Sequence, residues 1–232
     1  MKKKYTTLLF DADGTLIDFD KDEHDALISA LKFYGHDLTE EEISAYSEIN
    51  LRLWKKFERG EIEKSEIERT RFGQFFEHLG IPLPVSAYEI NKTYLSFLAE
   101  GGNLIGGATE LLSVLKEKGY DMHIVTNGIF AVQKKRLAKA KIRDFFSEVF
   151  VSEIIGHQKP KKEFFEYVSI QIEEKDKSKI LLIGDSLTSD IKGAVNFGID
   201  SVWLNIKNSE RDEESLPTYE IKSLGELLTI IE

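Results

Sequence analysis

Two aspartates, Asp11 and Asp13, directly follow the apolar run Tyr5–Phe10. The run has the length and composition of a buried strand, and ligands of open α/β sheets bind beyond the carboxyl ends of the strands. Two carboxylates this close repel each other unless a cation or a proton is shared between them. The pair therefore predicts a metal or proton-transfer site. The alternative is an ordinary Asp-Gly turn, because Gly14 follows at once.

A second acidic cluster follows the apolar run Lys179–Ile183, with Asp185 at its end and Asp190 before a helical pattern. Parallel strands share one carboxyl edge, so these side chains are expected near Asp11 and Asp13. Carboxylates with few neutralising partners suit Mg²⁺, which also accepts phosphate oxygens, with Mn²⁺ as an alternative. The four aspartates thus predict a magnesium site. For Asp190 alone, an acid favoured by the helix dipole is the competing explanation.

Groups that could hold an anion follow two further runs. Thr126, Asn127 and Gly128 end the run Asp121–Thr126 and offer a hydroxyl and backbone N–H groups. Lys159 follows the next run and brings an ammonium to the same edge. Taken singly, Thr126 is more simply a helix cap and Lys159 a solvated lysine. Their common location favours an anion site beside the metal.

Runs of strand length alternate with helical patterns along most of the chain. The runs are Tyr5–Phe10, Asp121–Thr126, Glu148–Ser152, Lys179–Ile183 and Ser201–Leu204. Several are apolar nearly throughout, as expected where helices cover both faces of a sheet. The pattern predicts an α/β fold with a doubly wound parallel sheet.

Residues 17–100 contain no convincing strand. Their helical patterns are Asp22–Tyr34, Thr39–Arg59, Ile62–Leu79 and Val85–Ala99, and Thr39 with Glu42 forms a capping-box signature. A βα connection normally has a few residues, so this stretch is too long to be a loop. It predicts an all-helical domain at 17–100, inserted into a core made of 1–16 and 101–232.

The composition excludes several functions. The 31 basic against 41 acidic residues give a net charge of −10, which disfavours nucleic-acid binding. The absence of cysteine excludes disulfides, thiolate metal sites and a catalytic thiol. No apolar stretch approaches a membrane span, and Tyr5–Phe10 is too short for a signal peptide. A cytoplasmic protein without membrane partners is expected, as a monomer or homodimer.

The motifs, taken in order, resemble those of the haloacid-dehalogenase-like (HAD) superfamily. They are Asp11-x-Asp13-Gly14-Thr15, Thr126-Asn127-Gly128, Lys159-Pro160 and Gly184-Asp185-Ser186-x-x-x-Asp190. The helical insert is similar to the C1-type cap of that superfamily. The resemblance covers nearly the whole chain and implies a doubly wound core with a helical cap.

Within the superfamily, the chain looks most like the bacterial house-cleaning 5′-nucleotidases that act on pyrimidine nucleoside monophosphates. The stretches that carry this likeness are Phe10–Asp13, Ile49–Trp54 with Gly60, Arg71-Phe72, Thr126–Ile129 and Val202–Asn205. The resemblance implies a small phosphomonoester as the partner. It also implies that the cap contacts the nucleoside, with Asn50, Trp54 and Arg71 as candidates; core packing is an equal alternative for Trp54.

The resemblance implies a mechanism as well. Asp11 would attack phosphorus to form an aspartyl-phosphate, while Asp13 protonates the leaving oxygen and then activates water. Mg²⁺ would lie on Asp11, Asp185 and the Asp13 backbone carbonyl, with Asp190 on Lys159 or on a metal-bound water. Lys159 and the Thr-Asn-Gly motif would hold the remaining phosphate charge. A dehalogenase needs no acid for a halide, so Asp13 favours phosphate chemistry.

Three alternatives remain at this stage. A HAD phosphatase or phosphomutase acting on a sugar phosphate or another small phosphomonoester would use the same core residues. A signalling receiver domain also holds a phosphoryl group with Asp, Thr and Lys, although it needs neither the long insert nor Asp13. A catalytically dead nucleotide-binding module is disfavoured by the complete set of Asp11, Asp13, Lys159 and Asp185.

Overall fold

The computed structural model describes residues 4–211 and 216–231. It divides into two compact units, Met1–Asp18 with Asn103–Glu232 and Phe19–Gly102. We call them the α/β unit and the helical unit. Each boundary lies two residues further along the chain than the sequence analysis places it.

The α/β unit is built on a parallel sheet. In the described part of the chain its strands are β1 (Thr7–Phe10), β2 (Asp121–Thr126), β3 (Glu148–Val151), β4 (Ile180–Gly184), β5 (Asp200–Leu204) and β6 (Tyr219–Ile221). They lie in the order β3-β2-β1-β4-β5-β6, and all neighbouring pairs are parallel. The predicted doubly wound parallel sheet is therefore confirmed. The edge strand β6 was not predicted, because three residues are too few to show a pattern.

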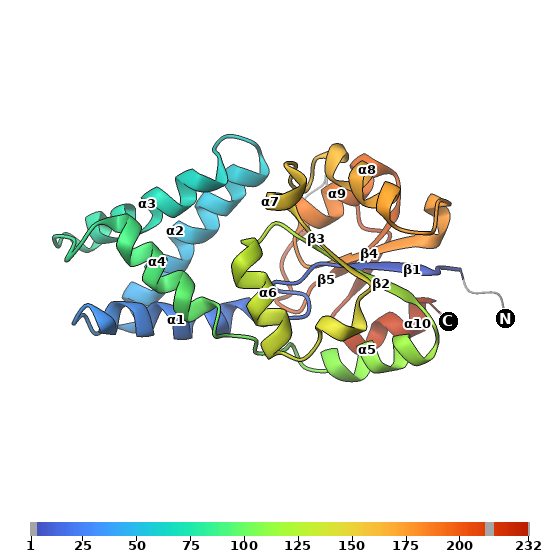
Figure 1. Ribbon diagram of the computed structural model, residues 1–232, viewed down its shortest axis with the longest axis horizontal. Coiled ribbons are helices and arrows are strands. Elements are labelled where there is room, and N and C mark those ends of the chain that lie inside the picture. Colours follow the sequence, from blue (N-terminus) through green and yellow to red (C-terminus); the bar gives the residue numbers. More distant parts are fainter. Residues whose placement is uncertain (1–3, 212–215, 232) are drawn as a thin grey trace. The chain divides into compact units, whose positions relative to one another are not determined.

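Helices cover both faces of this sheet. They are α5 (Ala108–Glu117), α6 (Phe130–Lys139), α7 (Ser152–Ile155), α8 (Lys162–Gln171), α9 (Lys192–Phe197) and α10 (Leu227–Ile231). Figure 1 shows α5 and α10 on one side of the strands and α8 and α9 on the other. Successive β1 side chains serve both faces: Leu8 and Phe10 join the core under α5 and α10, and Leu9 joins the core under α8 and α9.

The strands that carry the sequence motifs are neighbours and end at one edge. Phe10, the last residue of β1, pairs with Ile124 on one side and with Ile183 on the other. The end of β2 at Thr126 pairs with Val151, the end of β3. Residues that follow β1, β2, β3 and β4 therefore start from adjacent positions in space.

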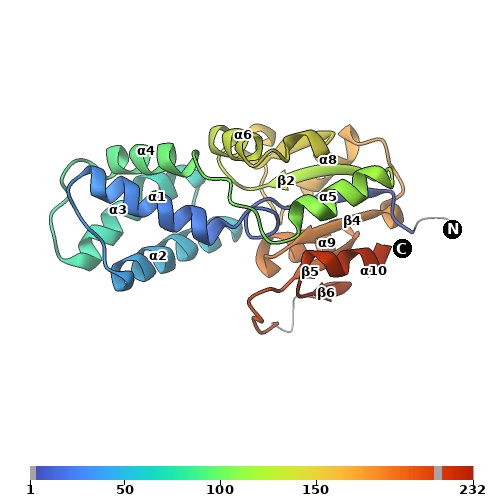
Figure 2. The same ribbon diagram turned by 90° about the horizontal axis from the view of Figure 1, so that it is seen from below.

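The helical unit consists of four helices in the described residues (Figure 2). They are α1 (Phe19–Phe33), α2 (Glu40–Glu58), α3 (Lys64–Leu79) and α4 (Ala87–Leu98). Thr39 and Glu42 form the predicted capping box at the start of α2. The rings of Tyr46, Phe72 and Tyr94 pack together with centroids 5.2–5.6 Å apart. The unit therefore has an aromatic core of its own.

The two segments at which the α/β unit meets the inserted residues run side by side. The Asp18 backbone N–H donates to the Asn103 carbonyl at 2.9 Å, and Ile17 pairs antiparallel with Leu104.

Across residues 4–211 and 216–231, no helix is long and apolar enough to cross a lipid bilayer.

Candidate active site

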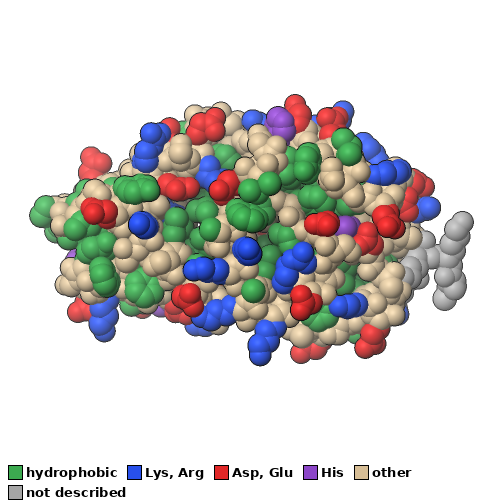
Figure 3. All heavy atoms as spheres, viewed as in Figure 1, with side chains coloured by type: hydrophobic (Ala, Val, Ile, Leu, Met, Phe, Trp, Pro, Cys, Tyr) green, Lys and Arg blue, Asp and Glu red, His purple; other side chains and the backbone are tan. Residues whose placement is uncertain are grey.

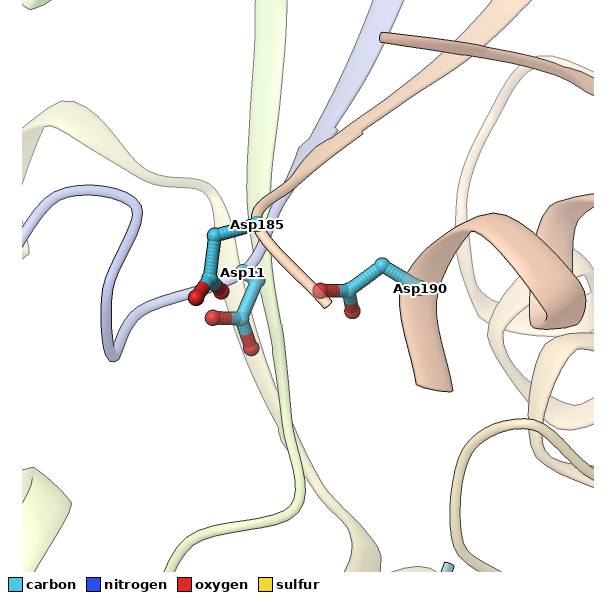
Figure 4. A group of neighbouring side chains, drawn as sticks. All are labelled: Asp11, Asp185 and Asp190. Atoms are coloured by element: carbon cyan, nitrogen blue, oxygen red, sulfur yellow. The ribbon is translucent and has the colours of Figure 1, made fainter. Parts of the chain in front are cut away.

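Three carboxylates gather at the carboxyl edge of the sheet. Asp11 follows β1, Asp185 follows β4, and Asp190 lies in the π-helical turn Leu187–Ile191 that leads into α9. One oxygen from each lies within 4.8 Å of the others. Figure 4 shows the side chains of Asp11 and Asp185 next to each other, with the Asp190 carboxylate facing them. Asp11 and Asp190 are buried, and Asp185 is more open.

Lys159 joins two of these carboxylates. Its buried Nζ donates to Asp11 Oδ1 and to Asp190 Oδ1, each at 2.6 Å, and to the Val125 carbonyl at 2.8 Å. An ammonium has three N–H donors, so these bonds use all of them. Burial alone lowers the pKa of Lys159, but the Asp11 and Asp190 charges outweigh it and raise that pKa. Lys159 is therefore a permanent cation that fixes the orientation of Asp11.

The cluster has more acidic than basic groups, since three carboxyl groups face one ammonium, and it carries excess negative charge when they are ionised. Burial raises the pKa of Asp11 well above its ordinary range, against the opposing effect of Lys159. Removal from bulk water, followed by the Asp190 charge, raises the pKa of Asp185 to about 7. By contrast, acidic and basic side chains are interspersed on the face drawn in Figure 3. The excess charge and all-oxygen donor set of the cluster fit a hard divalent cation such as Mg²⁺.

Gly14 makes room for Asp185. Its backbone has a φ of 80°, a conformation that glycine adopts without strain. A Cβ at this position would collide with the Asp185 carboxyl group. From the other side, the Trp203 indole N–H donates to the Asp185 carbonyl at 2.8 Å. Gly14, in the motif after β1, thus leaves the space that Asp185, in the motif after β4, occupies.

The Thr126 hydroxyl is arranged to donate a hydrogen bond. Its Oγ1 accepts from the Gly128 N–H and from Gln133 Nε2, each at 3.0 Å. A hydroxyl has two acceptor sites and one proton, so both acceptor sites are filled and the proton remains. That proton suits a phosphate oxygen, as the sequence predicts for Thr126. The Gly128 N–H, also predicted to bind the anion, instead contacts Thr126 in this structure.

Asn127 contacts Lys159 through both atoms of its side-chain amide. Nδ2 donates to the Lys159 carbonyl and Oδ1 accepts from the Lys159 N–H, each at 2.9 Å. The side chain therefore holds the backbone that presents the Lys159 ammonium. Direct contact of Asn127 with substrate stays a prediction.

The Asp13 side chain is separate from the three-carboxylate cluster in the described residues. Both of its oxygens contact buried side chains of α6: Arg136 Nη1 bonds Oδ1, and Gln133 Nε2 donates to Oδ2 at 2.6 Å. A role of the Asp13 carbonyl in metal binding stays a prediction. The sequence analysis missed Gln133 and Arg136. The available signal was their spacing of three on a helix that directly follows the Thr-Asn-Gly motif.

The predicted nucleoside-contacting residues belong to the helical unit. Asn50 donates to Glu23 Oε1 at 2.6 Å and accepts from Arg71 Nη1 at 3.3 Å, and both Asn50 and Arg71 are buried. Trp54 is partly exposed, and its ring packs edge-on against Phe57 with centroids 5.8 Å apart. Asn50 and Arg71 are thus members of a polar network, whereas the Lys64 ammonium lies over the Trp54 ring, 6.0 Å from its centroid. Their contact with substrate stays a prediction.

Comparison with known proteins agrees with this geometry. Residues 5–198 match the family model of the haloacid dehalogenase-like hydrolases. The chain is 40% identical to the pyrimidine 5′-nucleotidase PynA of Streptococcus pneumoniae, over 98% of this chain and 95% of PynA. It is 33% identical to the pyrimidine 5′-nucleotidase YjjG of Escherichia coli, over 97% and 96% of the two chains.

A solved structure agrees as well. The crystal structure of the Bacillus subtilis HAD hydrolase YfnB bound to magnesium superposes with a TM-score of 0.93, at 40% identity, over 98% of this chain and 99% of YfnB. The ordered motifs, the parallel sheet and these full-length matches lead to one assignment. The chain is a member of the haloacid dehalogenase-like hydrolase family.

Proposed function

We propose that this enzyme is a magnesium-dependent phosphatase that hydrolyses pyrimidine nucleoside 5′-monophosphates through an aspartyl-phosphate on Asp11. The observation that carries the proposal is the Lys159 ammonium, bonded at once to Asp11 and to Asp190 beside Asp185. This arrangement holds one carboxylate in a fixed orientation within a site whose excess negative charge suits a cation. It is what attack by a carboxylate on a phosphate ester requires.

In the first step, an Asp11 carboxylate oxygen attacks phosphorus, and the bond from phosphorus to the nucleoside oxygen breaks. Asp13 donates a proton to that oxygen, which leaves as an alcohol. The Lys159 charge and the remaining Thr126 proton stabilise the phosphoryl oxygens. Positioning and charge neutralisation must supply most of the acceleration, because phosphate monoesters are very inert and a carboxylate is a modest nucleophile.

In the second step, water attacks the phosphorus of the aspartyl-phosphate. Asp13, now ionised, takes a proton from this water, and the bond between phosphorus and Asp11 breaks. Inorganic phosphate forms, and both carboxyl groups return to their starting states. One residue thus serves as acid and then as base, so its orientation matters in both steps.

Asp11, Asp185 and the Asp13 carbonyl are the proposed magnesium ligands. When bound, Mg²⁺ supplies positive charge that neutralises the nonbridging phosphate oxygens. Asp190 is included in the predicted metal site, but both of its oxygens have protein partners: Oδ1 accepts from Lys159, and Oδ2 accepts from the Ser186 N–H at 3.1 Å. We therefore assign Asp190 mainly to holding Lys159.

The substrate class is supported by the names of two full-length relatives, PynA and YjjG. In the helical unit, Trp54 is a partly exposed aromatic residue of the kind on which a base stacks. A phosphatase or phosphomutase for sugar phosphates is the alternative, because the catalytic residues of the α/β unit do not distinguish the two.

The test is phosphate release with Mg²⁺ from pyrimidine and purine nucleoside monophosphates and from sugar phosphates. We expect pyrimidine nucleotides to give the highest kcat/KM, and Asp11→Asn to lower their turnover about a thousandfold or more. Asp144→Asn, which removes an exposed carboxylate, is the charge-matched control. A preference for sugar phosphates would favour the alternative, phosphate moved within the substrate would indicate a mutase, and a stable phosphoprotein without turnover would indicate a receiver. Activity retained by Asp11→Asn would refute the nucleophile.

A further inference from the structure

Helix α6 buries two polar side chains at the carboxyl edge of the sheet. Gln133 and Arg136 are each 1% exposed, and their spacing of three places them on one face of the helix. A buried guanidinium is costly to the fold unless a partner compensates its charge. The partners of these two side chains therefore indicate what the helix is arranged to do.

Both side chains bind Asp13, one at each carboxylate oxygen. Arg136 Nη1 forms an ion pair with Oδ1, and Gln133 Nε2 donates to Oδ2 at 2.6 Å. The second Gln133 N–H donates to Thr126 Oγ1 at 3.0 Å, and Gln133 Oε1 accepts from Arg136 at 3.3 Å. Gln133 thus connects the proposed acid–base group to the proposed phosphate-binding hydroxyl.

The loop after β2 leaves room for this connection. Gly128 has no side chain at the point where Gln133 passes, and a Cβ there would lie 2.5 Å from Gln133 Nε2. The Thr-Asn-Gly motif therefore supplies Thr126 and, through Gly128, also leaves the space that the Gln133 side chain occupies. Gln133 and the Thr-Asn-Gly motif thus form one packed arrangement.

We propose that Gln133 and Arg136 are positioning residues that hold Asp13 for both of its proton transfers, an inference that rests on the proposed phosphatase chemistry. A carboxylate has about four lone-pair sites, so two hydrogen bonds leave sites free to exchange a proton. Neither a guanidinium nor an amide gives up its own protons near neutral pH. This clamp, formed by Gln133 and Arg136, fixes the direction of the Asp13 oxygens and leaves lone-pair sites on them open for the proton.

The inference predicts a dependence on the leaving group. An alkyl phosphate needs a proton on its leaving oxygen, whereas p-nitrophenolate leaves without one. If a substitution in the clamp displaces Asp13, the first step should become slower for alkyl esters only. The second step, attack by water, is common to all substrates and should slow for each. With p-nitrophenyl phosphate the phosphoenzyme should accumulate, giving a burst of p-nitrophenol equal to the enzyme concentration.

The test compares Gln133→Met and Arg136→Met with Lys135→Met, an exposed position on the same helix. For the best alkyl phosphate in the wild-type panel, we expect kcat to fall about tenfold or more while KM changes less than about threefold. We expect a p-nitrophenol burst larger than that of the wild type, and wild-type behaviour in Lys135→Met. Arg136→Lys, which keeps the charge, should restore part of the kcat. The proposal would be overturned if Gln133→Met and Arg136→Met lowered kcat or KM equally for the alkyl phosphate and for p-nitrophenyl phosphate and gave no burst.

A double substitution keeps the test valid if folding is affected. In an Asp13→Asn background, Gln133→Met should lower kcat no further, because a positioning residue acts only through the group it positions. A full additional loss would overturn the clamp. If the wild type releases no phosphate from nucleotides but the burst appears, the substrate class is wrong and the clamp stands. If Asp13→Asn leaves both steps unchanged, the proposed acid–base chemistry is wrong and the clamp falls with it.

Discussion

Asn127 and Lys159 are joined by two reciprocal hydrogen bonds, from Nδ2 to the Lys159 carbonyl and from the Lys159 N–H to Oδ1, each 2.9 Å long. The bonds link the loop after β2 to the loop after β3. Lys159 in turn reaches Asp11, which follows β1. The Asn127 side chain therefore helps to hold three motifs together, because it fixes Lys159 and Lys159 contacts Asp11.

We expect Asn127→Ala to destabilise the fold by about 1–3 kcal/mol, since it leaves a buried donor and a buried acceptor unpaired. The kcat should fall as well, because the Lys159 ammonium loses its support. Asn196→Ala is the matched control: Asn196 is exposed and donates a single bond to the Pro160 carbonyl of the same loop. Urea denaturation and steady-state kinetics measure both effects. Equal losses in the two variants would contradict a special role for Asn127.

Gly14→Ala should cost both stability and activity. A left-handed backbone costs a non-glycine residue about 1–2 kcal/mol, and the added Cβ would displace Asp185. Gly107→Ala is the control, because Gly107 has a similar φ of 85° with no atom near the new Cβ. Denaturation should show a comparable backbone cost in both variants, with loss of phosphate release confined to Gly14→Ala. Full activity in Gly14→Ala would show that Asp185 can move freely.

Magnesium should stabilise the folded protein through Asp185. At a concentration 100 times its Kd, a ligand specific to the folded state contributes about 2.7 kcal/mol. Thermal unfolding with EDTA and with added Mg²⁺ should therefore give a higher Tm with the metal. Asp185→Asn should lose most of this gain, and the exposed-site variant Asp144→Asn should keep it. An undiminished gain in Asp185→Asn would move the metal elsewhere.

Glu23 should make the stability of the helical unit depend on pH. Burial raises its pKa, against hydrogen bonds from Ser47 and Asn50 at 2.7 and 2.6 Å. Above the ordinary Glu value of about 4.3, the folded state therefore holds a proton that the unfolded state has lost. The free energy of unfolding contributed by Glu23 must fall as pH rises from that value through the raised pKa.

Urea denaturation of the wild type and Glu23→Gln across this pH range measures that contribution. The stability of the variant relative to the wild type should increase with pH, while Glu48→Gln, an exposed position in the same unit, should follow the wild type. The opposite slope would mean that the charged form of Glu23 is favoured in the fold.

Trp54→Ala should raise the KM for nucleotides and leave p-nitrophenyl phosphate unaffected, if Trp54 stacks on the base as proposed. Base stacking on an aromatic side chain contributes about 1–3 kcal/mol, so an increase of about five- to a hundredfold is expected. Tyr88→Ala removes another exposed aromatic ring of the helical unit and serves as the control. Equal losses on both substrates would instead indicate that Trp54 supports the fold.

The sheet and the placement of the motif residues at its carboxyl edge could be predicted because their signals are local. Apolar runs mark the strands, and each motif directly follows a run. The three-residue strand β6 is too short to show alternation, and the four-residue helix α7 completes only about one turn. The helical pattern after Asp190 corresponds to α9, which is preceded by a π-helical turn over Leu187–Ile191. In this turn the Ser186 hydroxyl accepts from the Ser189 N–H at 3.2 Å.

The clamp on Asp13 was missed for a different reason. Residues 133–136 read Gln-Lys-Lys-Arg, and composition alone does not show which of these polar side chains point inward. The answer depends on how α6 is rotated about its axis, which is set by the packing of buried Val132 and Leu137. That rotation is a property of the packed fold.

The pairing of Asp18 with Asn103 brings the departing and returning chain together at a single point of the α/β unit. Because the two ends of the insertion are adjacent, the insertion can change in length or sequence without any change in the order or connections of the strands. Selection can thus exchange one inserted unit for another while the hydrolase core stays in place.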